Sequence, residues 1–372
     1  MRRIRKITVK SSRTGRKARW RPNNRRKVKK GKNRLLRSAV RRSAPIDKLW
    51  WMEQRAIKAG FIAASDKERS HLSLENMQES LNTWYGEHNS GDASVSRVLS
   101  LSLAYRRGYA LASRISDIGI ALPLQGKASV VVSICNEEQT LPAVLSELCK
   151  LPLKEIIVVL NGCTDGSFAA IVRDPRMILL HIPERLGHDV SRALGSALSS
   201  GDIVLFCDGD MSLPAEELAA FLIAVDLGVD IALNNLTPYL PTFSGQDDVT
   251  RCKTFLNQAL GRSDLGANSL TAVPHALSRK AIETLGTEAL IVPPKAQALA
   301  LVRGLKVSAP YSVNVVRNNR IRSGNTGEGN SVAGLIIGDH VEAFAEVMKS
   351  EGNRLRFVTY SRSELAKVRN AR

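Results

Sequence analysis

The chain has 372 residues, of which 44% are hydrophobic and 24% are charged. This balance is typical of a globular protein and excludes a collagen-like or wholly disordered chain. No apolar stretch reaches the roughly 18 residues that a transmembrane helix needs, and no signal peptide is recognisable. The five cysteines form no CxxC pair. We therefore expect a cytoplasmic protein without disulfides or a structural zinc site.

The positive charge is concentrated at the beginning of the chain. Residues 1–42 hold 20 of the 54 Lys and Arg residues and no Asp or Glu, and the rest of the chain is close to neutral. Few apolar groups offset this repulsion, so we predict that residues 1–43 form a basic disordered tail. Such a tail is expected to contact a polyanion: nucleic acid, an anionic membrane surface or a cell-wall polymer. The expected location is therefore cytoplasmic, with peripheral attachment to an anionic surface as an option.

A helical extension is predicted for residues 44–125. Apolar residues recur at three- and four-residue spacing within 49–57, 77–84 and 98–113. The last of these helices carries arginines beside tyrosines. We interpret this stripe as the edge of a core with a solvated rim, and contact with nucleic acid as the alternative.

The pattern changes at Ser129, where short β-branched runs begin. Strands are predicted at 129–134, 155–160, 177–182, 203–206 and 230–233, with helices of about ten residues between them. This alternation predicts an α/β fold with a mostly parallel, doubly wound sheet. Ligands of such sheets bind at the carboxyl ends of the strands, so the loops after the strands are the candidate site.

Polar residues follow the first two predicted strands. Asn136 and Glu137 come after the first, where they can bond a nucleobase or ribose. The alternative is a helix start with Asn136 as N-cap. The second strand ends in Asn161-Gly-Cys-Thr-Asp-Gly-Ser167, whose glycines permit close approach of a ligand. The glycine spacing matches neither the dinucleotide fingerprint nor the P-loop.

The fourth predicted strand ends in Cys207-Asp-Gly-Asp210. Asp208 and Asp210 can ligate a hard divalent cation through oxygen, and the cation can bridge a substrate diphosphate. The alternative is a polar turn that caps the next helix. We predict that both aspartates serve catalysis and metal binding, with Mn²⁺ or Mg²⁺ as the cofactor.

These three motifs, in this order and at these separations, resemble family-two glycosyltransferases of the GT-A fold. The resemblance covers about 128–233 and includes the stretches 184–187 and 191–195. It implies a GT-A type sheet and metal-dependent transfer of a sugar from a donor such as a UDP- or GDP-sugar. By position, it implies donor-binding roles for Asn136, Glu137, Asn161, Arg185, Arg192 and Asp208, and makes Asp210 the direct metal ligand.

The sequence departs from this family at the place of its acidic pair. Pro293 and Pro294 stand where the pair is expected, so the catalytic base is not assigned. A base elsewhere, a retaining mechanism and an inactive protein all remain open. The other candidate bases have no motif behind them and are interpreted as surface charge: Asp264, Glu288, Asp247 and Asp248.

Three further features lie outside these motifs. His340 is a candidate third metal ligand, and the alternative is a helix N-cap at Asp339 with a capping box. Residues 317–329 form a basic, glycine-containing loop that either closes over a donor diphosphate or is simply exposed. His188 and His275 are interpreted as structural or surface residues.

The predicted function is glycosyl transfer to an acceptor that no motif specifies. The first alternative is an inactive GT-A scaffold that binds polyanions. A nucleotidyltransferase ranks last, because no glycine-rich phosphate loop with a lysine follows the first strand. The predicted segments are a basic tail (1–43), a helical extension (44–125), a nucleotide-sugar-binding α/β half (126–240), an acceptor-side half (241–345) and a C-terminal helical and basic tail (346–372).

Overall fold

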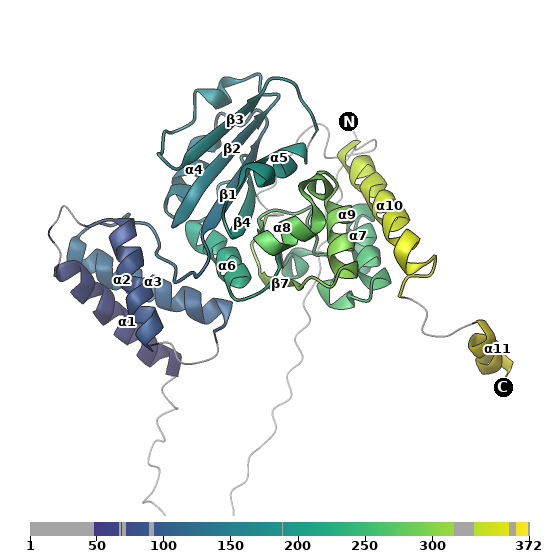
Figure 1. Ribbon diagram of the computed structural model, residues 1–372, viewed down its shortest axis with the longest axis horizontal. Helices are drawn as coiled ribbons and strands as arrows, with labels where there is room; N and C mark the ends of the chain where they lie inside the picture. Colours follow the sequence, from purple (N-terminus) through teal and green to yellow (C-terminus); the bar gives the residue numbers. More distant parts are fainter. Residues whose placement is uncertain are drawn as a thin grey trace, which may run out of the picture. The chain divides into compact units, whose positions relative to one another are not determined.

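A computed structural model describes most of the chain after the basic tail (Figure 1). The described residues are 48–66, 68, 72–88, 93–187, 189–315, 331–356 and 362–370. They all belong to one compact unit, residues 47–372. The predicted tail 1–43, His188 and the predicted loop 317–329 lie outside the described residues. The predicted boundaries at 126, 241 and 346 fall inside the unit.

A seven-stranded sheet with the order β3-β2-β1-β4-β6-β5-β7 forms the centre of this unit. Its strands are β1 (Ala128–Ile134), β2 (Leu153–Asn161), β3 (Met177–Ile182), β4 (Ile203–Asp208), β5 (Ile231–Asn234), β6 (His275–Ser278) and β7 (Val307–Tyr311). β3, β2, β1 and β4 are parallel, β6 runs antiparallel to β4 and β5, and β7 is parallel to β5. The predicted mostly parallel α/β sheet is confirmed, with β6 and β7 as additions.

Helices cover both faces of the sheet, as the alternation of strand and helix predicted. They are α4 (Leu141–Cys149), α5 (Val190–Leu198), α6 (Ala215–Asp226), α7 (Asp248–Ala259), α8 (Arg279–Leu285) and α9 (Pro293–Val302), followed by α10 (Ser331–Glu351) and α11 (Arg362–Asn370). Val130 and Val132 of β1 belong to one hydrophobic core with α4 and α6, whereas Val131 belongs to another with α9. None of the described helices is long and apolar enough to cross a bilayer.

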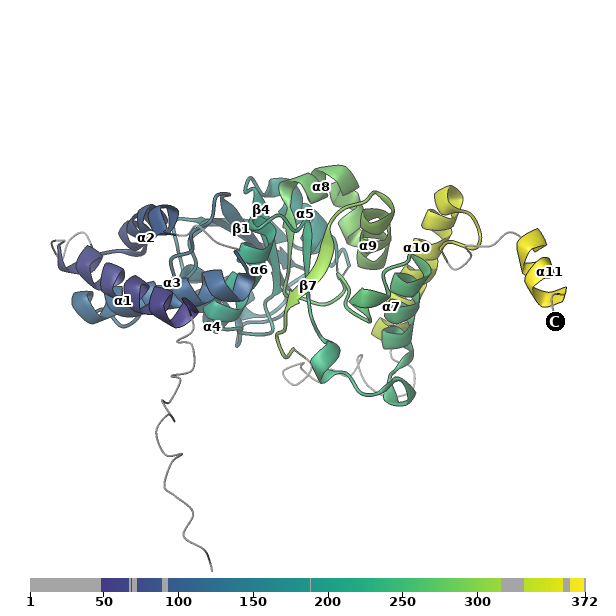
Figure 2. The same ribbon diagram turned by 90° about the horizontal axis from the view of Figure 1, so that it is seen from below.

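The predicted helical extension has a small core of its own. It consists of α1 (Lys48–Ser65), α2 (Leu74–His88) and α3 (Val95–Ser113), packed around Met77, Leu81, Tyr105 and Tyr109. α1 and α3 lie side by side (Figure 2). Arg106 of α3 pairs with Glu216 of α6 at 3.0 Å, which links the extension to the sheet region.

Two glycines permit the close packing of α1 on α3. A Cβ atom on Gly108 would lie 1.9 Å from the carbonyl oxygen of Ile57, and one on Gly60 would lie 2.1 Å from that of Tyr105. Both obstacles are backbone atoms, so the two helices must separate to admit a side chain.

We expect Gly108→Ala to lower the free energy of unfolding by about 2 kcal/mol, because overpacking outweighs the better helix propensity of alanine. Gly86 of α2 is the matched control, since no atom lies within 4 Å of a Cβ built there. Gly86→Ala should raise stability by about 0.5–1 kcal/mol. Urea unfolding followed by circular dichroism measures both. A Gly108→Ala protein as stable as the Gly86→Ala protein would contradict the close crossing.

Candidate functional site

The loops that follow β1, β2, β3 and β4 meet at one edge of the sheet, around a small cavity of about 50 Å³. Five of the predicted site residues line it: Glu137, Asn161, Arg185, Asp208 and Asp210. They come from four segments, and the parallel strands bring them together because their carboxyl ends share this edge.

The loops after β1 and β2 are joined by hydrogen bonds. The Oδ1 of Asn136 accepts from the backbone N–H of Thr164 at 2.7 Å. The backbone N–H of Glu137 donates to the Oγ of Ser167 at 2.8 Å, and the Oε2 of Glu138 accepts from the N–H of Gly166 at 2.7 Å. The two loops therefore form one polar platform.

Asn136 does not cap the following helix. Its φ angle is +63°, and Thr140 occupies the N-cap position of α4. The alternative of an N-cap at Asn136 was therefore wrong: the left-handed backbone turns the side chain toward the loop after β2 instead. Glu137 next to it is only 3% exposed.

Asn161 fixes the loop after β3. Its Oδ1 accepts from the N–H of Leu186 at 2.9 Å, and its Nδ2 donates to the carbonyl of Gly187 at 2.7 Å and to the Oγ of Ser191 at 3.1 Å. The side chain is 4% exposed. Asn161 therefore shapes the loop that carries Arg185.

Gly209 lets the two aspartates lie close to the loop after β1. A Cβ on Gly209 would lie 2.9 Å from Cγ1 of Ile134. The N–H of Gly209 donates to the carbonyl of Ser133 at 2.9 Å, and the Oγ1 of Thr140 donates to the carbonyl of Gly209 at 2.7 Å. Asp208 and Asp210 lie on either side of Gly209 in the chain, and both are half-buried.

The two predicted diphosphate arginines have different surroundings. The guanidinium of Arg192 is 4% exposed, with Nη1 2.7 Å from Oδ1 of Asp189 and Nη2 3.6 Å from Oδ1 of Asp208. Arg185 is exposed at the cavity, and its guanidinium pairs with none of the described residues. Arg192 thus contacts an acidic site residue, whereas Arg185 is accessible to an anion.

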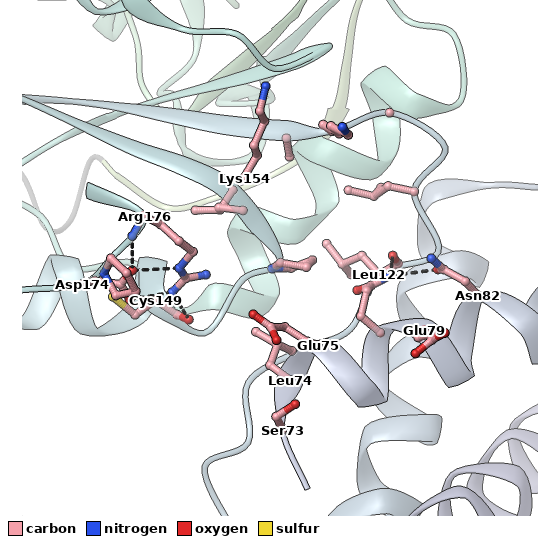
Figure 3. A pocket seen from close by; sticks show the side chains of 18 of the residues that line it. Ser73, Leu74, Glu75, Glu79, Asn82, Leu122, Cys149, Lys154, Asp174 and Arg176 are labelled. Atoms are coloured by element: carbon pink, nitrogen blue, oxygen red, sulfur yellow. Dashed lines mark hydrogen bonds and ion pairs between the residues drawn. The ribbon is translucent and has the colours of Figure 1, made fainter. Parts of the chain in front are cut away.

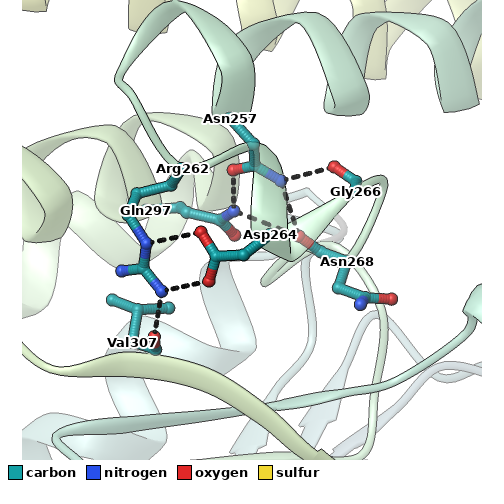
Figure 4. A network of polar contacts seen from close by, with 7 residues as sticks. All are labelled: Asn257, Arg262, Asp264, Gly266, Asn268, Gln297 and Val307. Atoms are coloured by element: carbon teal, nitrogen blue, oxygen red, sulfur yellow. Dashed lines mark hydrogen bonds and ion pairs between the residues drawn. The ribbon is translucent and has the colours of Figure 1, made fainter.

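The candidate base Asp264 is part of an ion pair. Both of its carboxylate oxygens accept from Arg262, at 2.9 and 2.8 Å, and Arg262 also donates to the carbonyl of Val307 at 2.8 Å (Figure 4). The hydrogen bond from Arg262 lowers the pKa of Asp264, which weakens it as a base. Neither Asp264 nor the exposed Glu288 lines the cavity.

Pro293 and Pro294 form the buried first turn of α9, where proline is well tolerated. One turn later the buried Gln297 accepts from the N–H of Leu270 at 2.8 Å. Its Nε2 donates to the Oδ1 of Asn257 at 2.7 Å (Figure 4). An uncharged network thus occupies the region just beyond the place where the family resemblance implied an acidic pair.

His340 lies inside α10 and not at a helix start. Because α10 begins at Ser331, the alternative of an N-cap at Asp339 was wrong. His340 is 1% exposed, its Nδ1 bonds the carbonyl of Ile336 at 2.6 Å, and burial lowers its pKa. Burial, together with nearby Asp189 and Glu342, raises the pKa of Asp339 to about 6.

Within the described ranges, no three His, Cys, Asp or Glu residues are grouped to hold a metal ion. A metal role for His340 stays a prediction.

The structural interpretation of His275 agrees with its surroundings. Its ring is 2% exposed and lies 5.1 Å from the ring of Phe206, and its Nδ1 bonds the carbonyl of Ala272 at 2.9 Å. Burial lowers the pKa of His275 to about 3, so its ring is neutral.

A larger cavity of about 840 Å³ lies at the opposite, amino ends of the strands (Figure 3). α2 and the first residues of β1 and β2 line it. Arg176 fixes one wall by donating to Asp174 and to the carbonyls of Leu151 and Cys149, each at 2.9–3.0 Å. The cavity lies away from the loops with the predicted site residues.

Residues 129–271 match the family described as Glycosyl transferase family 2. The matched segment contains all three loop motifs, which confirms the resemblance predicted from them.

Named relatives match less than a third of the chain. The undecaprenyl-phosphate 4-deoxy-4-formamido-L-arabinose transferase of Proteus mirabilis is 29% identical over 115 residues, which are 28% of this chain and 35% of the relative. The enzyme of that name from Salmonella choleraesuis is 27% identical over 121 residues, 30% of this chain and 37% of the relative. The chain thus spans little more than a third of the length of these relatives.

Among solved structures, the chain is similar to glucosyl-3-phosphoglycerate synthase from Mycobacterium tuberculosis, crystallised with Mn²⁺, uridine diphosphate and phosphoglyceric acid. The similarity has a TM-score of 0.44 and 20% sequence identity, and it covers 59% of this chain and 78% of that one.

Proposed function

We propose that this protein transfers a glycosyl group from a nucleoside-diphosphate sugar, and that the donor binds on the loops after β1, β2, β3 and β4. The observation that carries this proposal is the meeting of Asp208 and Asp210 with Glu137 and Arg185 around one cavity. The match of residues 129–271 to Glycosyl transferase family 2 supports the reaction class.

The residues of the site fit a divalent cation. Asp208 and Asp210 offer carboxylate oxygens, which Mn²⁺ and Mg²⁺ prefer, and Gly209 leaves no side chain between them. Two protein ligands leave room for diphosphate oxygens and water, as is usual for these ions in phosphate sites. When bound, the cation neutralises charge that develops on the departing diphosphate.

The neighbouring side chains have separate proposed roles. Arg185 binds the diphosphate through its exposed guanidinium. Asn136 and Glu137, on the platform made by the first two loops, contact the nucleoside. Asn161 acts through the loop that it fixes, and Arg192 acts through Asp208. The acceptor-side base stays unassigned.

A thermal-shift panel tests the proposal. The purified full chain is heated with UDP-glucose, UDP-N-acetylglucosamine or GDP-mannose, with and without MnCl₂. We expect one donor to raise the melting temperature by several degrees only when Mn²⁺ is present, because ligand binding to the native state stabilises it. The Asp208→Asn/Asp210→Asn variant should show no donor-dependent shift.

Other outcomes would replace the proposal. No shift with any donor, together with salt-sensitive binding of a polyanion, would favour the scaffold alternative that the basic tail suggested. Release of pyrophosphate from a nucleoside triphosphate would identify a nucleotidyltransferase.

A further inference from the structure

The helical extension carries large apolar side chains on its surface. Trp50, Trp51, Phe61 and Ile62 of α1 are 46–54% exposed, and Leu111 of α3 is 62% exposed. Trp50 and Trp51 contact each other edge to face, with ring centroids 5.1 Å apart. In the described part of the chain, no element covers these side chains. Exposed aromatic groups of this size usually mark an interaction site.

These side chains lie along the α1–α3 pair, and Ile62 also lines a groove with Glu79 and Glu87 of α2. The two helices cross at Gly60 and Gly108, and Gly108 lies against the backbone of Ile57 and Phe61. Phe61 and Leu111 follow this crossing on their own helices. α2 shares a core with Met52 and Ala56 of α1 and lies beside the same pair of helices (Figure 2).

The charges of the extension are divided between its helices. α3 contains no Asp or Glu, and the only acid of α1, Glu53, accepts a hydrogen bond from Ser100. The opposite holds for α2, which carries Glu75, Glu79 and Glu87 but no Lys or Arg. The exposed basic residues of the α1–α3 surface are Lys48, Arg55, Lys58, Arg107 and Arg114.

We propose that this basic aromatic face, defined by Trp50, Trp51, Phe61, Ile62 and Leu111 with the five basic residues, docks onto an anionic lipid bilayer. Tryptophan and phenylalanine prefer the boundary between headgroups and acyl chains, and Lys and Arg beside them attract anionic headgroups.

The composition of the face favours a bilayer over nucleic acid. Single-stranded nucleic acid is held by aromatic stacking platforms along a basic groove. Here the aliphatic side chains of Ile62 and Leu111 offer no stacking surface, but they gain energy on leaving water for acyl chains. The face is separate from the candidate donor site, so the inference goes beyond the proposed glycosyl transfer.

Tryptophan fluorescence tests which part of the chain enters the lipid. The full chain is mixed with phosphatidylcholine vesicles that contain roughly 30% phosphatidylglycerol, with brominated acyl chains as quencher. We expect quenching that the Trp50→Phe/Trp51→Phe variant loses, although Trp20 and Trp84 remain in it. Quenching that persists in this variant would place the contact elsewhere, for example at Trp20 of the basic tail, and would overturn the proposal.

Vesicle co-sedimentation adds a test with matched variants. Phe61→Ser/Leu111→Ser should lower the partition coefficient by about tenfold or more, because two apolar anchors are lost. The control Phe168→Ser/Phe243→Ser removes side chains that are 56% and 67% exposed outside the extension, and it should partition like the wild type. Equal partitioning of all three proteins would overturn the proposal. If single-stranded RNA displaced the protein from the vesicles and quenched Trp50 and Trp51, the ligand of this face would be nucleic acid and not a bilayer.

Discussion

Replacing Asp210 by asparagine is expected to lower kcat/KM for the sugar nucleotide by roughly a thousandfold, because the variant loses the charge that holds the cation against the diphosphate. Asp210 lines the cavity with Asp208 and Arg185, so its loss leaves one aspartate for the cation and one guanidinium for the diphosphate. The measurement is steady-state turnover of the donor that the thermal-shift panel identifies, over a range of Mn²⁺ concentrations.

Asp264→Asn is the matched control for this experiment. Asp264 is tied to Arg262 and does not line the cavity, so its replacement should leave kcat/KM nearly unchanged. If Asp264→Asn abolished turnover while Asp210→Asn retained it, the roles given to these two aspartates would be reversed and the metal site would be elsewhere.

The second large effect is expected for Arg192→Gln. This change leaves Asp189 and Asp208 without the buried cation between them, which should lower the free energy of unfolding by about 3 kcal/mol. It should also weaken Mn²⁺ binding, measured by titration of the manganese spin signal, because Asp208 loses the group that orients it. Arg192→Lys keeps the charge and should recover much of the stability.

If Arg192 instead binds the diphosphate directly, as the sequence predicted, its substitution should have a different effect. A direct ligand would raise KM for the donor on substitution and leave Mn²⁺ affinity and stability almost unchanged. Arg176→Gln serves as the control. It removes a similar ion pair, with Asp174, at the amino end of β3, and should lower stability without changing Mn²⁺ affinity.

The strands and loops that carry the site were predictable because the information is local. β1, β2 and β4 contain the apolar runs 130–132, 156–160 and 203–207, with polar residues after each, and parallel strands place such ends at one edge. β6 has four residues and pairs antiparallel with β4, far away in the chain. No local pattern specifies such pairing, so this insertion was missed.

The roles of individual site residues were harder to predict because they depend on burial. Arg185 and Arg192 look alike in sequence, yet one is exposed and the other is enclosed by two aspartates. The capping patterns at Asn136 and Asp339 were misleading for a related reason. Asparagine suits an N-cap and a left-handed turn equally, and an acidic residue can form an apparent cap within a longer helix.

The hydrogen bonds between the loops after β1 and β2 have a consequence for changing donor preference by loop exchange. Asn136, Glu137 and Glu138 are matched to Thr164, Ser167 and Gly166, residue against residue. A loop transplanted alone from a protein of Glycosyl transferase family 2 would leave half of these partners unmatched. The loops after β1 and β2 must therefore be grafted, recombined or randomised together.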